Sequence, residues 1–160
     1  MEKLMTKKVA FLFPGQGSQA IGMGKDLYEN FESAKSVFDV ADSTLNKSVS
    51  TICFEGPEED LKQTVNTQPA IVTMSIAAME ALKSQLDISA DYVAGHSLGE
   101  YCAMYAAGVM SLENTLKAIQ KRADLMGSTK GGSMAAVLNA TEEQLKAGLA
   151  EGSKVGYVDV

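Results

Sequence analysis

Short apolar runs and longer stretches of helical periodicity alternate along the first 130 residues. Two runs predict buried strands, Lys8 to Phe13 (KVAFLF) and Asp91 to Ala94 (DYVA). Strands of a parallel sheet are buried on both faces and are joined by helices, so they appear as continuous apolar runs. Between them, Pro69 to Leu86 is apolar on most sides, which predicts a buried helix. The pattern indicates an α/β protein with a parallel sheet.

Four other segments of this part of the chain have helical character. Lys25 to Asn46 predicts a helix in two pieces. Pro57 to Leu61 is typical of a helix start, because proline comes first and acids occupy the first turn. Leu98 to Ala107 is rich in helix formers, and a further helix is predicted from Ser111 to Met126.

The pattern changes after residues 128–133 (STKGGS), which predict a flexible joint. The elements predicted beyond it are a strand, a helix opened by the capping box Thr141-Glu142-Glu143-Gln144, and a strand, at 134–138, 141–150 and 154–160. We therefore expect two domains, with residues 1–130 forming the N-terminal part of an α/β core and residues 131–160 beginning a smaller subdomain. A sheet that ends on a half-built unit indicates a truncated chain.

Composition narrows the class of protein. The 160 residues are 46% hydrophobic and 21% charged, as in soluble globular proteins, and no apolar run is long enough to span a membrane. The start has too few apolar residues for a signal peptide, and Met5 is an alternative first residue. The net charge of -6 argues against a nucleic-acid partner. Cys53 and Cys102 lack metal or redox spacing, which favours a reducing, cytoplasmic compartment and no bound metal.

The five residues Gly95-His96-Ser97-Leu98-Gly99 follow the second predicted strand. They match G-x-S-x-G, the spacing of a nucleophile elbow, in which a sharp strand-to-helix turn presents a serine hydroxyl. Glycines on both sides are needed because strand and helix pack closely there. The pattern predicts covalent acyl chemistry on Ser97. The alternative is a glycine-bracketed turn with a solvated serine.

The turn Pro14 to Gln19 (PGQGSQ) follows the first predicted strand. Ligand sites of α/β sheets lie at the carboxyl ends of strands, so this turn and the elbow should open on the same crevice. An amide N–H of the turn could supply one half of an oxyanion hole, and the N–H of Leu98 the other. The alternative is a phosphate-binding loop, although the turn lacks the third glycine of a dinucleotide fingerprint and the Lys-Ser/Thr of a P-loop.

Arg122 is the only arginine in a chain with thirteen lysines. Its planar guanidinium matches a carboxylate in a way that lysine does not. At 1.5 Å per residue, the helix from Leu98 leads away from the elbow and the helix from Ser111 leads back, which places Arg122 about level with Ser97. A solvated arginine beside Lys121 is the alternative.

Five motifs occur in order along the chain: PGQGSQ at 14–19, TQPA at 67–70, GHSLGEY at 95–101, KRADLM at 121–126 and GSMAAV at 132–137. In order, spacing and wording they resemble the N-terminal half of malonyl-CoA:acyl carrier protein transacylases, over about residues 7–160. The resemblance implies an α/β-hydrolase-like core with an inserted ferredoxin-like subdomain. It also implies a cytoplasmic enzyme of fatty acid biosynthesis, with malonyl-CoA as substrate, no permanently bound cofactor, and acyl carrier protein as partner.

The resemblance also assigns roles to residues. Ser97 would attack the malonyl thioester and hold malonyl as an ester, which the phosphopantetheine thiol of the carrier then takes away. Gln16 and Leu98 would supply the backbone donors of the oxyanion hole. Arg122 would pair with the free malonyl carboxylate, and Gln68 and His96 fall at positions that line the site.

The chain departs from the family in its general base, which is a histidine late in the family's sequences. The one histidine here, His96, precedes Ser97, and adjacent residues at a strand end point to opposite faces. We therefore expect His96 to line the pocket or to hydrogen-bond locally. We also expect the chain alone to transfer malonyl very poorly or not at all, unless a second chain completes the fold. A serine esterase or thioesterase and a non-catalytic, carrier-binding fragment are the competing hypotheses.

Overall fold

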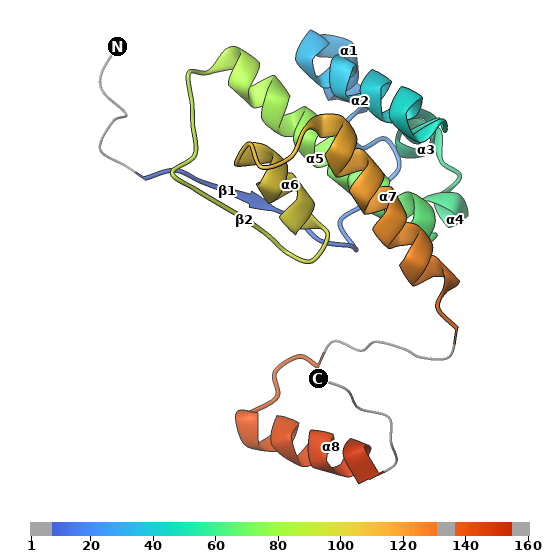
Figure 1. The fold of residues 1–160 in the computed structure, drawn as a ribbon, viewed down its shortest axis with the longest axis vertical. Coiled ribbons are helices and arrows are strands. Elements are labelled where there is room, and N and C mark those ends of the chain that lie inside the picture. The colour runs from blue at the N-terminus through green and yellow to red at the C-terminus, as the bar shows by residue number, and fades with distance from the viewer. Residues whose placement is uncertain (1–7, 131–136, 155–160) are drawn as a thin grey trace. The chain divides into compact units, whose positions relative to one another are not determined.

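The computed structural model describes residues 8–130 and 137–154, which divide into two compact units between Thr129 and Lys130. The first unit contains a small parallel sheet and a group of helices (Figure 1). Its elements are, in chain order, β1 (Ala10–Phe13), α1 (Lys25–Asn30), α2 (Glu32–Leu45), α3 (Val49–Glu55), α4 (Glu58–Leu61), α5 (Thr64–Gln85), β2 (Tyr92–Gly95), α6 (Gly99–Ala106) and α7 (Leu112–Ser128). The predicted α/β class is confirmed.

The two strands pair in parallel, with Ala10 opposite Tyr92 and Phe13 opposite Gly95. Asp91 holds the beginning of the pair together. Its carboxylate accepts hydrogen bonds from the Val9 N–H at 2.9 Å and from Lys8 Nζ at 2.7 Å. Because the pairing register is fixed at this end, the carboxyl ends of both strands lie side by side at the other end of the sheet.

The long helix α5 is the centre of the first unit, and α2, α3, α6 and α7 pack against it (Figure 1). It is apolar around most of its circumference, as its composition predicted. Helix α6 also contacts both strands, so it lies between the sheet and α5. The largest apolar side chains that are fully buried in this core are Phe38, Leu61, Ile76, Leu98, Leu116 and Ile119.

The two faces of the sheet differ in exposure. Phe13 is buried, and Phe11 and Val93 pack against the core from the same face. On the other face, Leu12 is 75% exposed and Tyr92 is 63% exposed. The described residues of the first unit therefore cover one face of the sheet only, although the sequence predicted strands buried on both.

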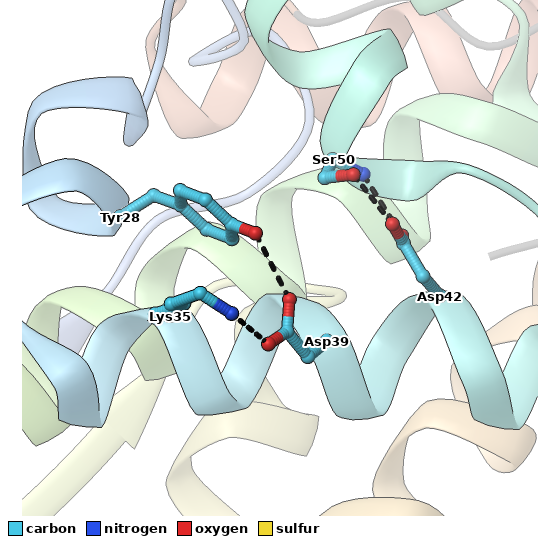
Figure 2. Close-up of polar contacts among 5 residues, drawn as sticks. All are labelled: Tyr28, Lys35, Asp39, Asp42 and Ser50. Carbon is cyan, nitrogen blue, oxygen red and sulfur yellow. Dashed lines mark hydrogen bonds and ion pairs between the residues drawn. The ribbon is translucent and has the colours of Figure 1, made fainter.

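Helix α3 was not predicted from the sequence. Its N-terminal end is held by Asp42 of α2, whose carboxylate accepts hydrogen bonds from the backbone N–H and the hydroxyl of Ser50 (Figure 2). On the same face of α2, Asp39 accepts from the Tyr28 hydroxyl at 3.1 Å and from the Lys35 ammonium (Figure 2). An acceptor from another helix satisfies free N–H groups that the local sequence leaves without a cap.

The boundaries of α5 correct another prediction. The helix begins at Thr64, so Pro69 lies inside it and not in its first turn. Proline is most frequent at the first helical position, because the missing N–H costs nothing there. In this protein α5 begins five residues before Pro69. Side chains from outside α5 donate to the backbone carbonyl of Val65, which Pro69 leaves without a donor in the helix.

In the second unit, the described residues contain α8 (Glu142–Lys154). The predicted capping box is confirmed, because Thr141 Oγ1 accepts from the Gln144 N–H and Gln144 Oε1 accepts from the Thr141 N–H. The strand predicted at 134–138 lies mostly outside the described residues, and Val137 and Leu138 are in neither a helix nor a strand. The strand predicted at 154–160 also lies outside, apart from Lys154, which ends α8.

In the described ranges, no helix has the length and apolar character to cross a membrane.

Candidate active site

Ser97 occupies a sharp turn between β2 and α6. Its φ is 55°, in the left-handed region that residues other than glycine rarely adopt. The preceding residue, His96, donates its N–H to the Phe13 carbonyl at 3.1 Å, which extends the strand pairing up to the turn. The helix starts at Gly99, two residues after the serine. This is the strained strand-turn-helix geometry of a nucleophile elbow, and it leaves the serine exposed.

Gly95 and Gly99 allow the strand and the helix to approach this closely. A Cβ atom on Gly95 would lie 2.0 Å from the carbonyl group of Gly99, and one on Gly99 would lie 2.6 Å from the Phe13 carbonyl oxygen. Both distances are far below van der Waals contact, and in both cases the obstacle is backbone, which cannot move aside. The two glycines of the motif are therefore required by packing on both sides of Ser97.

Arg122 extends from α7 to the elbow. Its Nη2 donates a hydrogen bond to Ser97 Oγ at 2.9 Å, and its Nη1 donates to Gln68 Oε1 of α5 at 2.7 Å. The side chain of Gln68 is fully buried. An uncharged acceptor thus holds one side of the guanidinium, while the other side remains directed at the serine.

Met126 is a contact residue that the sequence analysis did not single out. It lies one turn after Arg122 on α7, and its Sδ accepts from Gln68 Nε2 at 3.3 Å. A thioether is a weak acceptor, but it leaves the amide oxygen of Gln68 directed at the arginine. The i, i+4 spacing of Arg122 and Met126 was the signal that could have placed both on one face of the helix.

His96 lies against the glycine-rich turn after β1. A Cβ atom on Gly15 would be 2.4 Å from His96 Nδ1, so the imidazole packs directly on the backbone of that turn. The described residues show no hydrogen bond between His96 and Ser97 side chains. This packing gives no support to a role for His96 as the base for Ser97, and the expectation that His96 lines the pocket or hydrogen-bonds locally stays a prediction.

Gln16 lies in the exposed turn that follows β1, and Leu98 lies at the N-terminus of α6. In the part of the chain that the structure describes, the backbone N–H groups of these two residues have no hydrogen-bond acceptor. By contrast, the N–H of Gly17 is engaged by Gln19 Oε1 at 2.8 Å. Leu98 is 1% exposed, and its carbonyl accepts from Tyr101. An oxyanion hole needs free N–H groups of this kind, and the assignment of Gln16 and Leu98 to one stays a prediction.

The two cysteines take no part in this arrangement. Cys53 and Cys102 are both fully buried in the core. Burial, which disfavours the charged thiolate, raises the pKa of each thiol to about 12. Both are therefore protonated core residues at neutral pH, whereas the hydroxyl of Ser97 is exposed at the elbow.

The acyl transferase domain family matches residues 10–154, which include the elbow, Gln68 and Arg122. The chain belongs to this family. A curated relative, the malonyl CoA-acyl carrier protein transacylase of Bacillus subtilis (strain 168), is 49% identical over 142 residues, which are 87% of this chain and 44% of the relative. The chain thus spans about half the length of the curated relatives that it matches, and these are named as transacylases, a class of acyltransferase.

Solved structures of the acyl transferase family show the same fold. The malonyl CoA-acyl carrier protein transacylase of Clostridium perfringens superposes with a TM-score of 0.87 at 36% identity, over 96% of this chain and 49% of that one. A malonyl-transacylase in complex with its type II PKS acyl-carrier protein superposes with a TM-score of 0.84 at 30% identity, over 93% and 49% of the two chains. The predicted resemblance to the transacylases is confirmed.

Proposed function

We propose that this chain carries the nucleophile and the acyl-binding half of a malonyl-CoA:acyl carrier protein transacylase of fatty acid biosynthesis. The observation that carries the proposal is the position of Arg122, whose guanidinium reaches Ser97 Oγ directly. A serine esterase would have no use for a fixed positive charge at this distance from its nucleophile. A carboxylate at the far end of a short acyl group would pair with it.

The transfer proceeds in two steps. Ser97 Oγ attacks the thioester carbonyl of malonyl-CoA, its proton passes to the departing sulfur, and coenzyme A leaves as the free thiol. The phosphopantetheine thiol of acyl carrier protein then attacks the seryl ester, and the hydroxyl of Ser97 re-forms. Both steps pass through a tetrahedral oxyanion, which the N–H groups of Gln16 and Leu98 would stabilise. No resident cofactor is needed for this chemistry.

Arg122 selects the acyl group in this proposal. The malonyl carboxylate replaces Ser97 Oγ as the acceptor for Nη2, while Nη1 stays with Gln68. A fork-shaped guanidinium that already has one acceptor keeps its orientation as the ligand arrives. With an acetyl group, the guanidinium would face the acyl pocket without a partner, and that penalty discriminates against acetyl transfer.

The base that removes the Ser97 proton is not supplied by His96, which packs on Gly15. We therefore propose that a segment outside these 160 residues, in the same chain or in a second chain, supplies the base and covers the open face of the sheet. That segment would complete an α/β-hydrolase-like core, and the unit from residue 130 onward would begin a ferredoxin-like subdomain. A cytoplasmic location fits two reduced cysteines and the proposed substrates.

Incubation with malonyl-CoA, followed by mass spectrometry of the intact protein and of its peptides, tests the proposal. We expect a malonyl adduct on the peptide that contains Ser97, formed more slowly than by a transacylase that has its base. Acetyl-CoA should label the same residue less. Addition of holo-acyl carrier protein should then remove the adduct and yield malonyl-carrier. Labelling of another residue, or equal labelling by both thioesters, would contradict the proposal.

The fate of the adduct distinguishes the competing activities. Release of free malonate as the main product, with or without carrier protein, would identify a hydrolase. Affinity for carrier protein with no adduct on Ser97, even when the missing half of a relative is added, would identify a non-catalytic module. A Ser97→Ala variant, which cannot form the ester, is the matched control for both measurements.

A further inference from the structure

Pro69 interrupts the hydrogen bonding of α5 one residue after Gln68. Proline has no N–H, so the carbonyl of Val65, four residues earlier, loses its partner within the helix. Pro69 itself is buried, and Val65 is partly buried. An unpaired carbonyl inside a protein is destabilising, so the carbonyl of Val65 needs a donor from outside α5.

Two side chains from other parts of the first unit donate to that carbonyl. Lys47, which follows α2, reaches Val65 O with Nζ at 2.9 Å. Gln120 of α7 reaches it with Nε2 at 3.3 Å. Lys47 also donates to Asn66 Oδ1 at 3.2 Å. The gap in α5 is thus closed by donors that come from 18 and 55 residues away along the chain.

Two acceptors, Val65 O and Asp124 Oδ1, determine the orientation of the Gln120 amide. Nε2 is shared between Val65 O and Asp124 Oδ1, the latter at 2.7 Å. Oε1 is buried and has no hydrogen-bond partner among the described residues. If the amide were flipped, Oε1 would face the acceptors Val65 O and Asp124 Oδ1 without a hydrogen to donate. In the observed orientation the amide donates to both acceptors and leaves Oε1 without a partner among the described residues.

The Lys47 ammonium is also held by acceptors of α5. It is partly removed from water, and this burial lowers the pKa of its ammonium group, while the charge of Asp124 acts in the opposite direction. A lysine on an open surface would keep its head in solvent. Here the ammonium donates to the backbone and to a side chain of α5, and it interacts with the charge of Asp124 on α7.

These contacts lie on the same pair of helices that forms the candidate site. Gln120 is two residues before Arg122 on α7, and Val65 is three residues before Gln68 on α5. At Gly127 the helices are so close that a Cβ atom would be 2.8 Å from Val65 Cγ1. A turn of α7 by one residue would rotate Arg122 by roughly 100° away from the elbow.

We propose that Lys47 and Gln120 are positioning residues, which take up the carbonyl freed by Pro69 and so hold α7 in the register that directs Arg122 at Ser97. The claim that Lys47 and Gln120 hold the register of α7 does not depend on the reaction. Its effect on acyl selectivity rests on the proposed function. Neither side chain touches Ser97, so both act through Arg122.

The test removes the two donors together and then restores the missing N–H. Lys47→Met with Gln120→Leu leaves Val65 O without its donors, and Pro69→Ala in that background returns the backbone donor. Lys62→Met with Gln85→Leu is the matched control, since Lys62 is an exposed partner of Glu58 and Gln85 lies at the other end of α5. A double-mutant cycle of this kind isolates the coupling between the donors and Pro69.

Arg122 provides a direct readout because it is the only arginine in the chain. Its guanidinium signals in a 1H–15N NMR spectrum need no assignment among arginines. We expect slowed, dispersed Nη signals in the starting protein, averaged signals in the donor-free variant, and recovery when Pro69→Ala is added. Unchanged signals in the donor-free variant, or no recovery with Pro69→Ala, would overturn the proposal. If the donor-free variant does not fold, Lys47→Met alone is compared with and without Pro69→Ala.

Selectivity is the second readout. The ratio of malonyl to acetyl labelling of Ser97 should fall about tenfold in the donor-free variant, because a displaced binding group loses its alignment with the substrate. Acetyl labelling should change little, and the Lys62→Met, Gln85→Leu control should match the starting protein. A preserved ratio in the donor-free variant would contradict a positioning role. If the starting protein is labelled by neither thioester, the proposed function fails, and the Arg122 signals still decide the inference.

Discussion

Arg122 Nη2 lies 2.9 Å from Ser97 Oγ, although the two residues are 25 positions apart and belong to different elements. The contact joins a positive charge to the exposed hydroxyl of the elbow. It requires α6 to lead away from the elbow and α7 to return to it. A ligand with an electrophilic carbon next to Ser97 would therefore meet the guanidinium with its distal end.

Replacement of Arg122 should change which acyl group is transferred more than how fast transfer occurs. Arg122→Met should lower malonyl labelling of Ser97 by roughly 30- to 150-fold, because a charged hydrogen bond worth about 2–3 kcal/mol is lost. Acetyl labelling should stay the same or increase. Arg122→Lys keeps the charge without the fork and should recover only part of the malonyl rate. Parallel losses for both thioesters would show that Arg122 supports folding and not selection.

The backbone strain at Ser97 predicts that stability and function conflict at this position. Ser97→Gly should be more stable than Ser97→Ala by about 1 kcal/mol, since only glycine adopts a φ of 55° without a penalty. Neither variant can form a seryl ester. Urea unfolding followed by circular dichroism compares the two. A Ser97→Ala variant as stable as Ser97→Gly would mean that the turn relaxes and that the strain is not real.

Gly99 predicts a large steric effect next to the nucleophile. Gly99→Ala should reduce the free energy of unfolding by at least about 2–3 kcal/mol, because the new methyl group meets the Phe13 carbonyl at 2.6 Å. Gly148→Ala in α8, where the added methyl group would have open space, is the matched control and should be neutral or stabilising. Similar unfolding midpoints for both variants would contradict the close packing of α6 on β1.

Asp91 predicts an acid-dependent loss of stability. The Lys8 ammonium and the Val9 N–H, in that order, lower the pKa of its carboxyl below the usual 3.8. Because the folded-state pKa is below that of the unfolded chain, the contribution is complete at neutral pH and is lost as the pH falls through the folded-state value. The Asp91→Asn variant should be less stable than the starting protein at pH 7, and the difference should shrink below about pH 4. Asp87→Asn is the control, and an equal pH profile for all three proteins would exclude this role of Asp91.

Some elements were predicted well because their signals are local. The strand endings, the elbow and the helices around Ser97 follow from apolar runs and glycines that are adjacent in sequence. The helix predicted from Ser111 is α7, and the Ser111 hydroxyl caps it by accepting from the Asn114 N–H. Other elements depend on distant partners. Helix α3 is short and is capped by Asp42 of α2. The first turn of α5 precedes Pro69, although proline is usually found at the start of a helix.

The sequence by itself determined the chemistry that this protein presents: a serine bracketed by glycines after a strand, and a single arginine at a spacing that returns it to the same level. Steric limits and helical rise operate between near neighbours, so such features can be worked out residue by residue. Only the tertiary structure decided that Gln68, itself bonded to Met126, holds the guanidinium, and that Lys47 and Gln120 replace the hydrogen bond missing at Pro69. Which donor reaches a free carbonyl depends on how helices pack, and the free energy of that packing is shared by residues far apart in the chain.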